Sequence, residues 1–163
     1  MNKFKFTFLV IIFCACSDRN DFLLSEYQKS FSGMIGSKID IEELNSIQEY
    51  NFKVLVLLNT QCASCVLTAK RWSESVNHSI FNNKDIIFLT YGPPNEYFQT
   101  NFNESMKSFK DLNHIHYPSE EFIYKNNLEL YNLDVFLLNQ SDEILLIGDP
   151  TKDPLLRKLY KNF

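Results

Sequence analysis

The sequence predicts an α/β fold, a mixed sheet with helices on both of its faces. Two apolar runs, Lys53–Asn59 and Asp85–Tyr91, predict strands, and a helix-like segment between them completes a βαβ unit. Two later strands, Val135–Leu138 and Ile144–Ile147, are joined by the polar link Asn139–Asp142, which favours a hairpin. The first run is apolar at nearly every position, as expected of a central strand that is buried on both faces.

The helices are predicted from apolar residues at helical spacing and from residues that favour helix ends. Asp40–Glu43 fits a capping box, and the helix that it opens has three apolar residues on one face, Ile41, Leu44 and Ile47. The helix after the first strand carries a core-facing stripe of Cys62, Cys65, Ala69, Trp72 and Val76. A further helix is marked by Phe98, Phe102, Met106 and Phe109. Ser119–Glu121 starts another, and Asp153 caps a terminal helix that begins at Pro154.

The first fifteen residues have the features of a bacterial signal peptide. Lys3 and Lys5 form a short basic region, and the apolar segment Phe6–Phe13 follows it. This segment is too short to cross a bilayer as a helix, because a spanning helix needs about 20 apolar residues. We therefore expect residues 1–15 to be removed as a signal peptide.

The four residues Phe13-Cys14-Ala15-Cys16 resemble the lipobox of bacterial lipoproteins, in which small residues precede a cysteine that is lipidated and becomes the new N-terminus. Cys16 is the predicted lipidation site, because bulky Phe13 would lie just before the cleavage point if Cys14 were used. The alternatives are a plain secretory signal and a short uncleaved anchor. The resemblance implies a lipoprotein anchored on a membrane of the bacterial cell envelope, facing the periplasm or the cell surface.

Length and charge restrict what the mature chain can be. Removing residues 1–15 from the 163-residue chain leaves 148 residues, which is enough for one domain with a substantial core. Without Lys3 and Lys5 there are 14 Lys and Arg against 20 Asp and Glu, a net charge of −6. Residues 16–30 are predicted to be a lipidated N-terminus and tether, and residues 31–163 a single domain. An acidic chain without basic clusters argues against nucleic acid as a partner.

Cys62 and Cys65 remain for chemistry once Cys14 leaves with the signal and Cys16 is lipidated. The first sulfur lies at a helix N-terminus, where free amide N–H groups and the helix dipole stabilise a thiolate. The second lies about one turn further along the same face, close enough to resolve a mixed disulfide. A structural disulfide across two residues would close too small a loop to add much stability. Cys62 is therefore the predicted nucleophile and Cys65 the predicted resolving thiol.

Two alternatives use the same pair differently. His114 and His116 could join the two thiols in a four-ligand metal site, although zinc sites usually draw on paired Cys-x-x-Cys knuckles and this chain has one. We therefore expect no metal and no cofactor, with both histidines in a loop before Pro118. The second alternative is an inert pair on a scaffold that binds a partner.

The chain from about residue 30 to residue 163 resembles the thioredoxin fold, and more narrowly the TlpA-like thioredoxins that are tethered to bacterial membranes. The matching segments are Val54–Asn59, the motif Cys62-Ala-Ser-Cys65, and the hairpin of Phe136–Asn139 and Glu143–Ile147. The resemblance implies a thioredoxin-like mixed sheet and an envelope thiol–disulfide oxidoreductase whose catalytic residues are the two cysteines. It also implies protein thiols and disulfides as substrates, and a membrane electron donor that restores the dithiol.

Two positions depart from this family. An aromatic residue usually precedes the first cysteine, and here Gln61 stands there. The family also has a cis-proline facing the sulfurs, and Leu133 stands in its place; a cis bond before a non-proline residue costs about 3 kcal/mol, so a trans bond is expected. The adjacent Asp134 could assist proton transfer to Cys65, although a surface acid at the strand start is the simpler interpretation. These departures favour weak activity or the scaffold alternative.

The signal-like segment generates the first testable prediction. The apolar run followed by Ala15-Cys16 predicts that the mature protein is membrane-bound and begins at an acylated Cys16. Mass spectrometry of the N-terminal peptide from the native host should find the lipid on that cysteine, and Cys16→Ala should release the protein from the membrane fraction. An unmodified Cys16, or cleavage at another residue, would contradict the lipoprotein hypothesis.

Overall fold

The computed structural model describes residues 26, 29, 31, 33–41, 51–107, 115–116, 118, 120–128 and 134–163. The chain divides into two compact units, residues 1–34 and 35–163. In the first unit, Lys29 and Glu26 form an exposed ion pair of 2.5 Å. Among the described residues, the strands and the helices next to the two cysteines belong to the second unit, and the description that follows concerns this unit alone.

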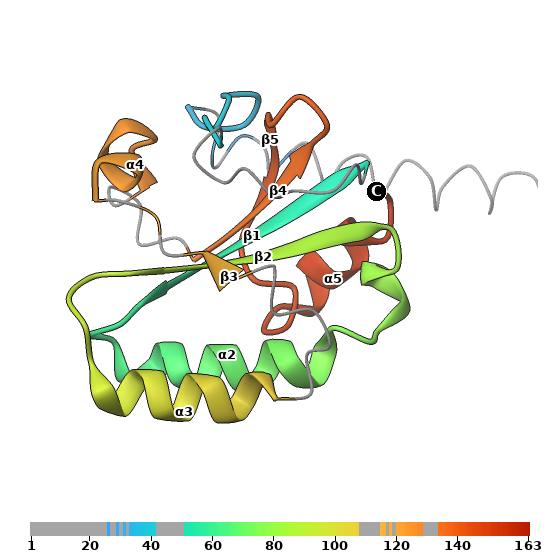
Figure 1. Cartoon of the computed structure of the whole chain (residues 1–163). Helices are drawn as coiled ribbons and strands as arrows, with labels where there is room; N and C mark the ends of the chain where they lie inside the picture. Colours follow the sequence, from blue (N-terminus) through green and yellow to red (C-terminus); the bar gives the residue numbers. More distant parts are fainter. Residues whose placement is uncertain are drawn as a thin grey trace, which may run out of the picture. The chain divides into compact units, whose positions relative to one another are not determined.

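The sheet of the second unit has five strands in the order β3-β2-β1-β4-β5 (Figure 1). Strands β1 and β2 are parallel, and β3 continues the sheet in parallel beyond β2. Strand β4 is antiparallel to β1, and β5 is antiparallel to β4. The strands are β1 (Phe52–Asn59), β2 (Lys84–Tyr91), β3 (Ile115–His116), β4 (Val135–Asn139) and β5 (Ile144–Ile147).

Strand β1 lies in the middle of the sheet because its side chains are apolar on both faces. Val54, Val56 and Leu58 point to one face and Leu55 and Leu57 to the other, and all five are at most 3% exposed. A strand covered on both faces, with a hydrogen-bonded neighbour on each side, has little freedom to shift its register. The predicted central strand is confirmed.

The helices lie on both faces of the sheet. In Figure 1, α2 (Ala63–Ser75), α3 (Glu96–Met106) and α5 (Pro154–Tyr160) lie below the sheet, and α4 (Glu120–Lys125) lies above it. A short 3-10 helix, η2 (Ser79–Phe81), precedes β2. The predicted α/β class, a mixed sheet with helices on both faces, is confirmed. Among the residues that the structure describes, no helix is both long enough and apolar enough to cross a membrane.

Aromatic side chains hold α2 and α3 against the sheet. Trp72 of α2 is fully buried, and its ring lies 5.1 Å from that of Phe81 and 6.4 Å from that of Phe88. Phe88 of β2 in turn meets Phe102 of α3 edge-to-face at 6.4 Å. Phe88 therefore connects both helices to β2, and the even-numbered positions at this end of the strand face the helices.

The terminal hairpin is organised by one side chain. The Asn139 side-chain oxygen accepts hydrogen bonds from the backbone N–H groups of Ser141 (2.8 Å) and Glu143 (3.0 Å). Asp142 takes a positive φ of 65° and its carboxylate pairs with Lys53 of β1 at 2.5 Å. This turn therefore fixes β5 against β4 and connects the hairpin to the central strand.

Some predicted features differ from the structure or lie outside its described part. The sequence did not predict β3 or η2, each of which is too short to show a period. The helix expected after Asp40 and the residue Phe109 lie outside the described residues. Asp40 itself is described: its backbone N–H donates to the Asn126 side chain at 2.7 Å, and its carboxylate pairs with Lys125 of α4.

Candidate active site

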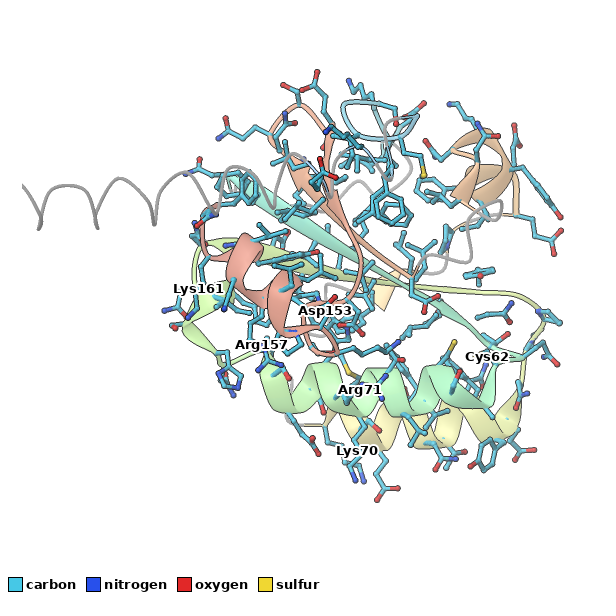
Figure 2. All side chains as sticks on the ribbon, turned by 180° about the vertical axis from the view of Figure 1, so that it is seen from behind. Cys62, Lys70, Arg71, Asp153, Arg157 and Lys161 are labelled. Atoms are coloured by element: carbon cyan, nitrogen blue, oxygen red, sulfur yellow. The ribbon has the colours of Figure 1, made fainter. Side chains whose placement is uncertain are left out.

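Cys62 lies where the central strand passes into α2 (Figure 2), and Cys65 follows in the first turn of that helix. Strand β1 ends at Asn59, and Cys62 is the N-cap of the helix, with an extended backbone (φ −99°, ψ 109°). The Cys62 N–H donates to the Asn59 carbonyl at 3.1 Å, and the Cys65 N–H donates to the Cys62 carbonyl at 3.0 Å. Both thiols are free, and they lie at the carboxyl end of β1, in the first turn of the helix.

The two thiols differ in their access to solvent. Cys65 is 6% exposed and belongs to the buried edge of α2 that continues through Ala69 and Trp72, whereas Cys62 is only partly buried. One turn of helix therefore separates a sulfur that a large molecule can reach from one that it cannot.

Hydrogen bonds favour the thiolate of Cys62. Partial burial of this thiol acts to raise its pKa, but hydrogen bonds from Cys65 and Ser64 outweigh that effect, and the pKa of Cys62 lies below its ordinary value. The Ser64 hydroxyl lies 3.0 Å from the Cys62 sulfur. Sequence reasoning predicted a lowered pKa from the helix N-terminus and did not identify Ser64, whose side-chain direction no sequence pattern indicates.

The environment of Cys65 has the opposite effect. Burial and, after it, the hydrogen bond with Cys62 raise the pKa of the Cys65 thiol to about 12, although a hydrogen bond with the Asn59 backbone acts against them. The negative charges of Cys62 and Asp134 also contribute to the raised pKa. Cys62 is therefore the thiol of the pair that ionises first, and Cys65 keeps its proton to a higher pH.

Asp134 belongs to a small charged cluster beside Cys65. Its backbone carbonyl accepts from the Leu57 N–H at 2.7 Å, which places it opposite the last residues of β1. Lys152 lies 3.9 Å from the Asp134 carboxylate and 3.6 Å from the carboxylate of Asp149, which is buried. Burial raises the pKa of Asp134, Lys152 opposes this and Asp149 adds to it, so that the pKa lies above its ordinary value.

The loop between β2 and α3 holds the segment that leads to Cys62. The Pro93 carbonyl accepts hydrogen bonds from the Thr60 hydroxyl at 2.7 Å and from the Gln61 side chain at 3.2 Å. Gly92 permits this approach, because it takes a φ of +101° and a Cβ there would lie 2.9 Å from the Thr60 hydroxyl oxygen. Gln61, which replaces the aromatic residue expected from the family resemblance, therefore has a structural role in this contact.

Several sequence-based candidates are not placed by the structure. Cys16, His114 and Leu133 lie outside the described residues, and of His116 only the backbone is described. Within the described part of the chain, no group of three or more His, Cys, Asp or Glu side chains is arranged to hold a metal ion.

Comparisons with known proteins give the fold. No protein-family model matches the chain, and no curated protein matches it in sequence. The thioredoxin domain of a thiol-disulfide oxidoreductase from Bacteroides vulgatus superposes with a TM-score of 0.50 at 10% identity, over 77% of this chain and 97% of that one. A thioredoxin-like protein from Parabacteroides distasonis has a TM-score of 0.49 at 16% identity, over 71% and 83%. One from Aeropyrum pernix has a TM-score of 0.49 at 14% identity, over 71% and 81%.

The asymmetry of the thiols generates a prediction about alkylation. In reduced protein, iodoacetamide should modify Cys62 near neutral pH while Cys65 stays unmodified, because only Cys62 has a lowered pKa. Ser64→Ala should raise the pKa of Cys62 by removing one of the hydrogen bonds that lower it. Ser73→Ala on the same helix is the control, since the Ser73 hydroxyl donates to the Lys70 carbonyl instead of the sulfur. Mass spectrometry should measure the modification of each thiol from pH 6 to pH 9. Equally slow modification of both thiols over this range would contradict the pKa difference described above.

A second prediction concerns the Gly92 contact. Gly92→Ala should lower the free energy of unfolding by about 1–3 kcal/mol, from the positive φ and the close approach to Thr60 together. Gly36→Ala is the matched control, because Gly36 also has a positive φ (+84°) but has nothing within 4 Å of a Cβ. Urea denaturation should show the larger loss for Gly92→Ala, and that variant alone should change the Cys62 alkylation rate. Equal losses of unfolding free energy in Gly92→Ala and Gly36→Ala would mean that the close approach to Thr60 adds nothing to the cost of the positive φ.

Proposed function

We propose that this chain, which has a thioredoxin-like fold, is a lipid-anchored, TlpA-like thiol–disulfide oxidoreductase of the bacterial envelope. The observation that supports this proposal best is that the structure lowers the pKa of one thiol and raises the pKa of its neighbour. One sulfur is accessible and has a lowered pKa, and the other is buried with a pKa of about 12. An attacking thiolate and a protected resolving thiol are what exchange with a protein disulfide requires.

The reaction begins at Cys62. Its thiolate attacks one sulfur of a substrate disulfide, which forms a mixed disulfide with Cys62 and releases the other substrate sulfur as a thiolate. Cys65 then loses its proton and attacks the Cys62 sulfur. This second step releases the remaining substrate thiolate and leaves a Cys62–Cys65 disulfide, so that two electrons have passed from the pair to the substrate. A dithiol electron donor at the membrane returns the pair to its reduced state.

The environment of Cys65 changes as the first step occurs. In the resting pair, the Cys62 thiolate raises the pKa of Cys65 by its charge and by the hydrogen bond that it accepts. A sulfur in a mixed disulfide carries no charge, and both effects end when the substrate is bound covalently. The pKa of Cys65 therefore falls at the stage at which it must ionise, and Asp134 is the candidate acceptor of its proton.

A non-catalytic scaffold is the second candidate function. It is favoured by the residues Leu133 and Gln61, which differ from those of the family that the chain resembles. A cis-proline and an aromatic residue are expected at these positions from the family resemblance. A scaffold would keep the fold and the two free thiols without turnover, so activity measurements decide between the two functions.

Trapping of mixed disulfides tests the proposed function. Cys65→Ser should accumulate disulfide-linked complexes with envelope proteins in the native host, because no thiol remains to resolve them. Cys62→Ser should trap none and should lose disulfide reductase activity. The wild-type protein should reduce insulin only weakly, since Leu133 replaces the expected proline. An absence of trapped complexes from Cys65→Ser, in a protein whose circular dichroism matches the wild type, would favour the scaffold.

A further inference from the structure

A buried carboxylate lies in the charged cluster beside Cys65. The side chain of Asp149, two residues after the end of β5, is 7% exposed. Its Oδ1 atom accepts hydrogen bonds from the Thr151 N–H at 2.8 Å and from the Thr151 hydroxyl at 2.6 Å. Its Oδ2 atom is buried and accepts no hydrogen bond from the described residues. A buried charge is costly unless an opposite charge lies near it, so this oxygen requires a cation.

Lys152 is the cation beside this oxygen, and it also reaches a second carboxylate. Its ammonium lies 3.6 Å from Asp149 Oδ2 and 3.9 Å from Asp134 Oδ2. The Lys152 N–H donates to the Asp149 carbonyl at 3.1 Å, which fixes the backbone of the lysine. The Asp149 carboxylate is buried and fixed by Thr151, whereas that of Asp134 is 47% exposed. Lys152 is therefore held by Asp149 and acts on Asp134 from there.

The segment that carries Asp134 is joined to the segment that carries Cys65. The Asp134 carbonyl accepts from the Leu57 N–H at 2.7 Å. Asn59, two residues further along β1, forms a backbone hydrogen bond with the Cys65 thiol, and the negative charge of Asp134 helps to raise the pKa of that thiol. The carboxylate therefore acts on the thiol that must lose its proton in the resolving step.

Two neighbours of opposite charge act on Asp134. Burial raises the pKa of its carboxyl group, Lys152 lowers this pKa and Asp149 raises it. Both neighbours belong to the segment that follows β5. Cys65 of α2, whose pKa Asp134 raises in turn, carries no charge until it ionises. Whether Asp134 can accept a proton therefore depends on the balance between Lys152 and Asp149.

We propose that Lys152 is a positioning residue for the resolving step, held by Asp149 so that the Asp134 carboxylate stays in place and charged to accept the Cys65 proton. The inference rests on the thiol–disulfide exchange proposed above. The proton passes from the Cys65 sulfur to the Asp134 carboxylate, and the Cys65 sulfur forms a bond with the Cys62 sulfur. The bond between Cys62 and the substrate breaks, and the substrate sulfur leaves as a thiolate with the electron pair. Asp134, which is partly exposed, then returns the proton to solvent.

The resolving step can be followed by itself with the aromatic disulfide dithiobis(nitrobenzoate). Attack by Cys62 releases one thionitrobenzoate and leaves the other on Cys62 as a mixed disulfide. Attack by Cys65 then releases the second, at a rate that does not depend on the reagent concentration, because buried Cys65 reacts within the molecule. Stopped-flow absorbance should measure both phases as a function of pH in the reduced full chain. Cys14→Ala and Cys16→Ala leave Cys62 and Cys65 as its only thiols.

The second phase should slow as the pH falls through the pKa of Asp134, because a protonated carboxyl group cannot accept the proton. Lys152→Met removes the charge that lowers this pKa, so this acid limb should move to higher pH. The expected shift is about 0.3–0.7 pH unit for a half-exposed ion pair, or about a two- to fivefold loss of rate at a fixed pH on the limb. Asp149→Asn removes the charge that raises the pKa, so the limb should move to lower pH. Asparagine keeps an oxygen for the bonds from Thr151.

Two further variants complete the experiment. Asp134→Asn should slow the second phase and remove the acid limb, because no carboxylate remains to accept the proton. Lys158→Met is the matched control, since it removes one positive charge from an exposed lysine of α5 and should leave the limb in place. A melting temperature measured for each variant identifies losses that come from unfolding. A merely structural role of Lys152 and Asp149 would not move the limb in opposite directions.

The outcomes separate this inference from the proposed function. Release of two thionitrobenzoates, with opposite shifts of the limb in Lys152→Met and Asp149→Asn, would support the role of Lys152. Release of two with a limb that stays in place, or that both variants move in the same direction, would overturn that role and leave the oxidoreductase proposal intact. A limb that persists in Asp134→Asn would overturn Asp134 as the acceptor, and the role of Lys152 with it. Release of only one from the wild-type pair would overturn the exchange reaction itself.

Discussion

Burial of β1 on both faces is the constraint on which the site depends. Because its five central residues are covered above and below, and because β2 and β4 pair with its two edges, the strand cannot slide or tilt without breaking the core. The first helical residue of α2 comes only four residues after the strand ends at Asn59. The position of Cys62 is therefore set by the core, while its sulfur is left partly exposed. The neighbouring strands supply the groups around it, Pro93 after β2 and Asp134 before β4.

The difference between the two thiols needs no special residue beyond Ser64. It follows from the geometry of a helix start, where the N-cap side chain lies outside the helix and a residue three positions later lies beneath it. Cys65 is buried by the same packing that buries Trp72, so its high pKa is a property of the core. A thiol that is hard to ionise also remains a hydrogen-bond donor, and it donates to the sulfur that ionises first. Each cysteine thus sets the protonation state of the other.

The fold could be predicted because the information is local. Continuous apolar runs identified β1 and β2, a stripe at spacings of three and four identified α2, and a polar link identified the β4–β5 hairpin. Strand β3 has two residues and shows no period, so only its pairing with β2 defines it. The position of the two cysteines followed from the same local patterns, since the motif stands between a strand and a helix.

The surroundings of the cysteines could not be predicted, because they depend on contacts distant in sequence. The Pro93 carbonyl that accepts from Gln61 is 32 residues away, and nothing near either residue indicates the contact. Asp149 and Lys152 are near each other in the chain, but their approach to Asp134 requires the hairpin to be folded. The cavity of about 160 Å³ next to Gln99 and Asn103 is likewise formed by strand, loop and helix together. Gly92 and the two prolines after it follow the end of β2, and the close approach of Gly92 to Thr60 appears only in three dimensions.

The hydrogen bond between Ser64 and the Cys62 sulfur has a consequence for the charge at the start of α2. When Cys62 is ionised, the tip of α2 carries a negative charge that balances the positive end of the helix dipole. In the disulfide form that charge is gone, and the same tip presents unbalanced amide groups and a hydroxyl without its charged acceptor. The two redox states therefore differ in local surface charge.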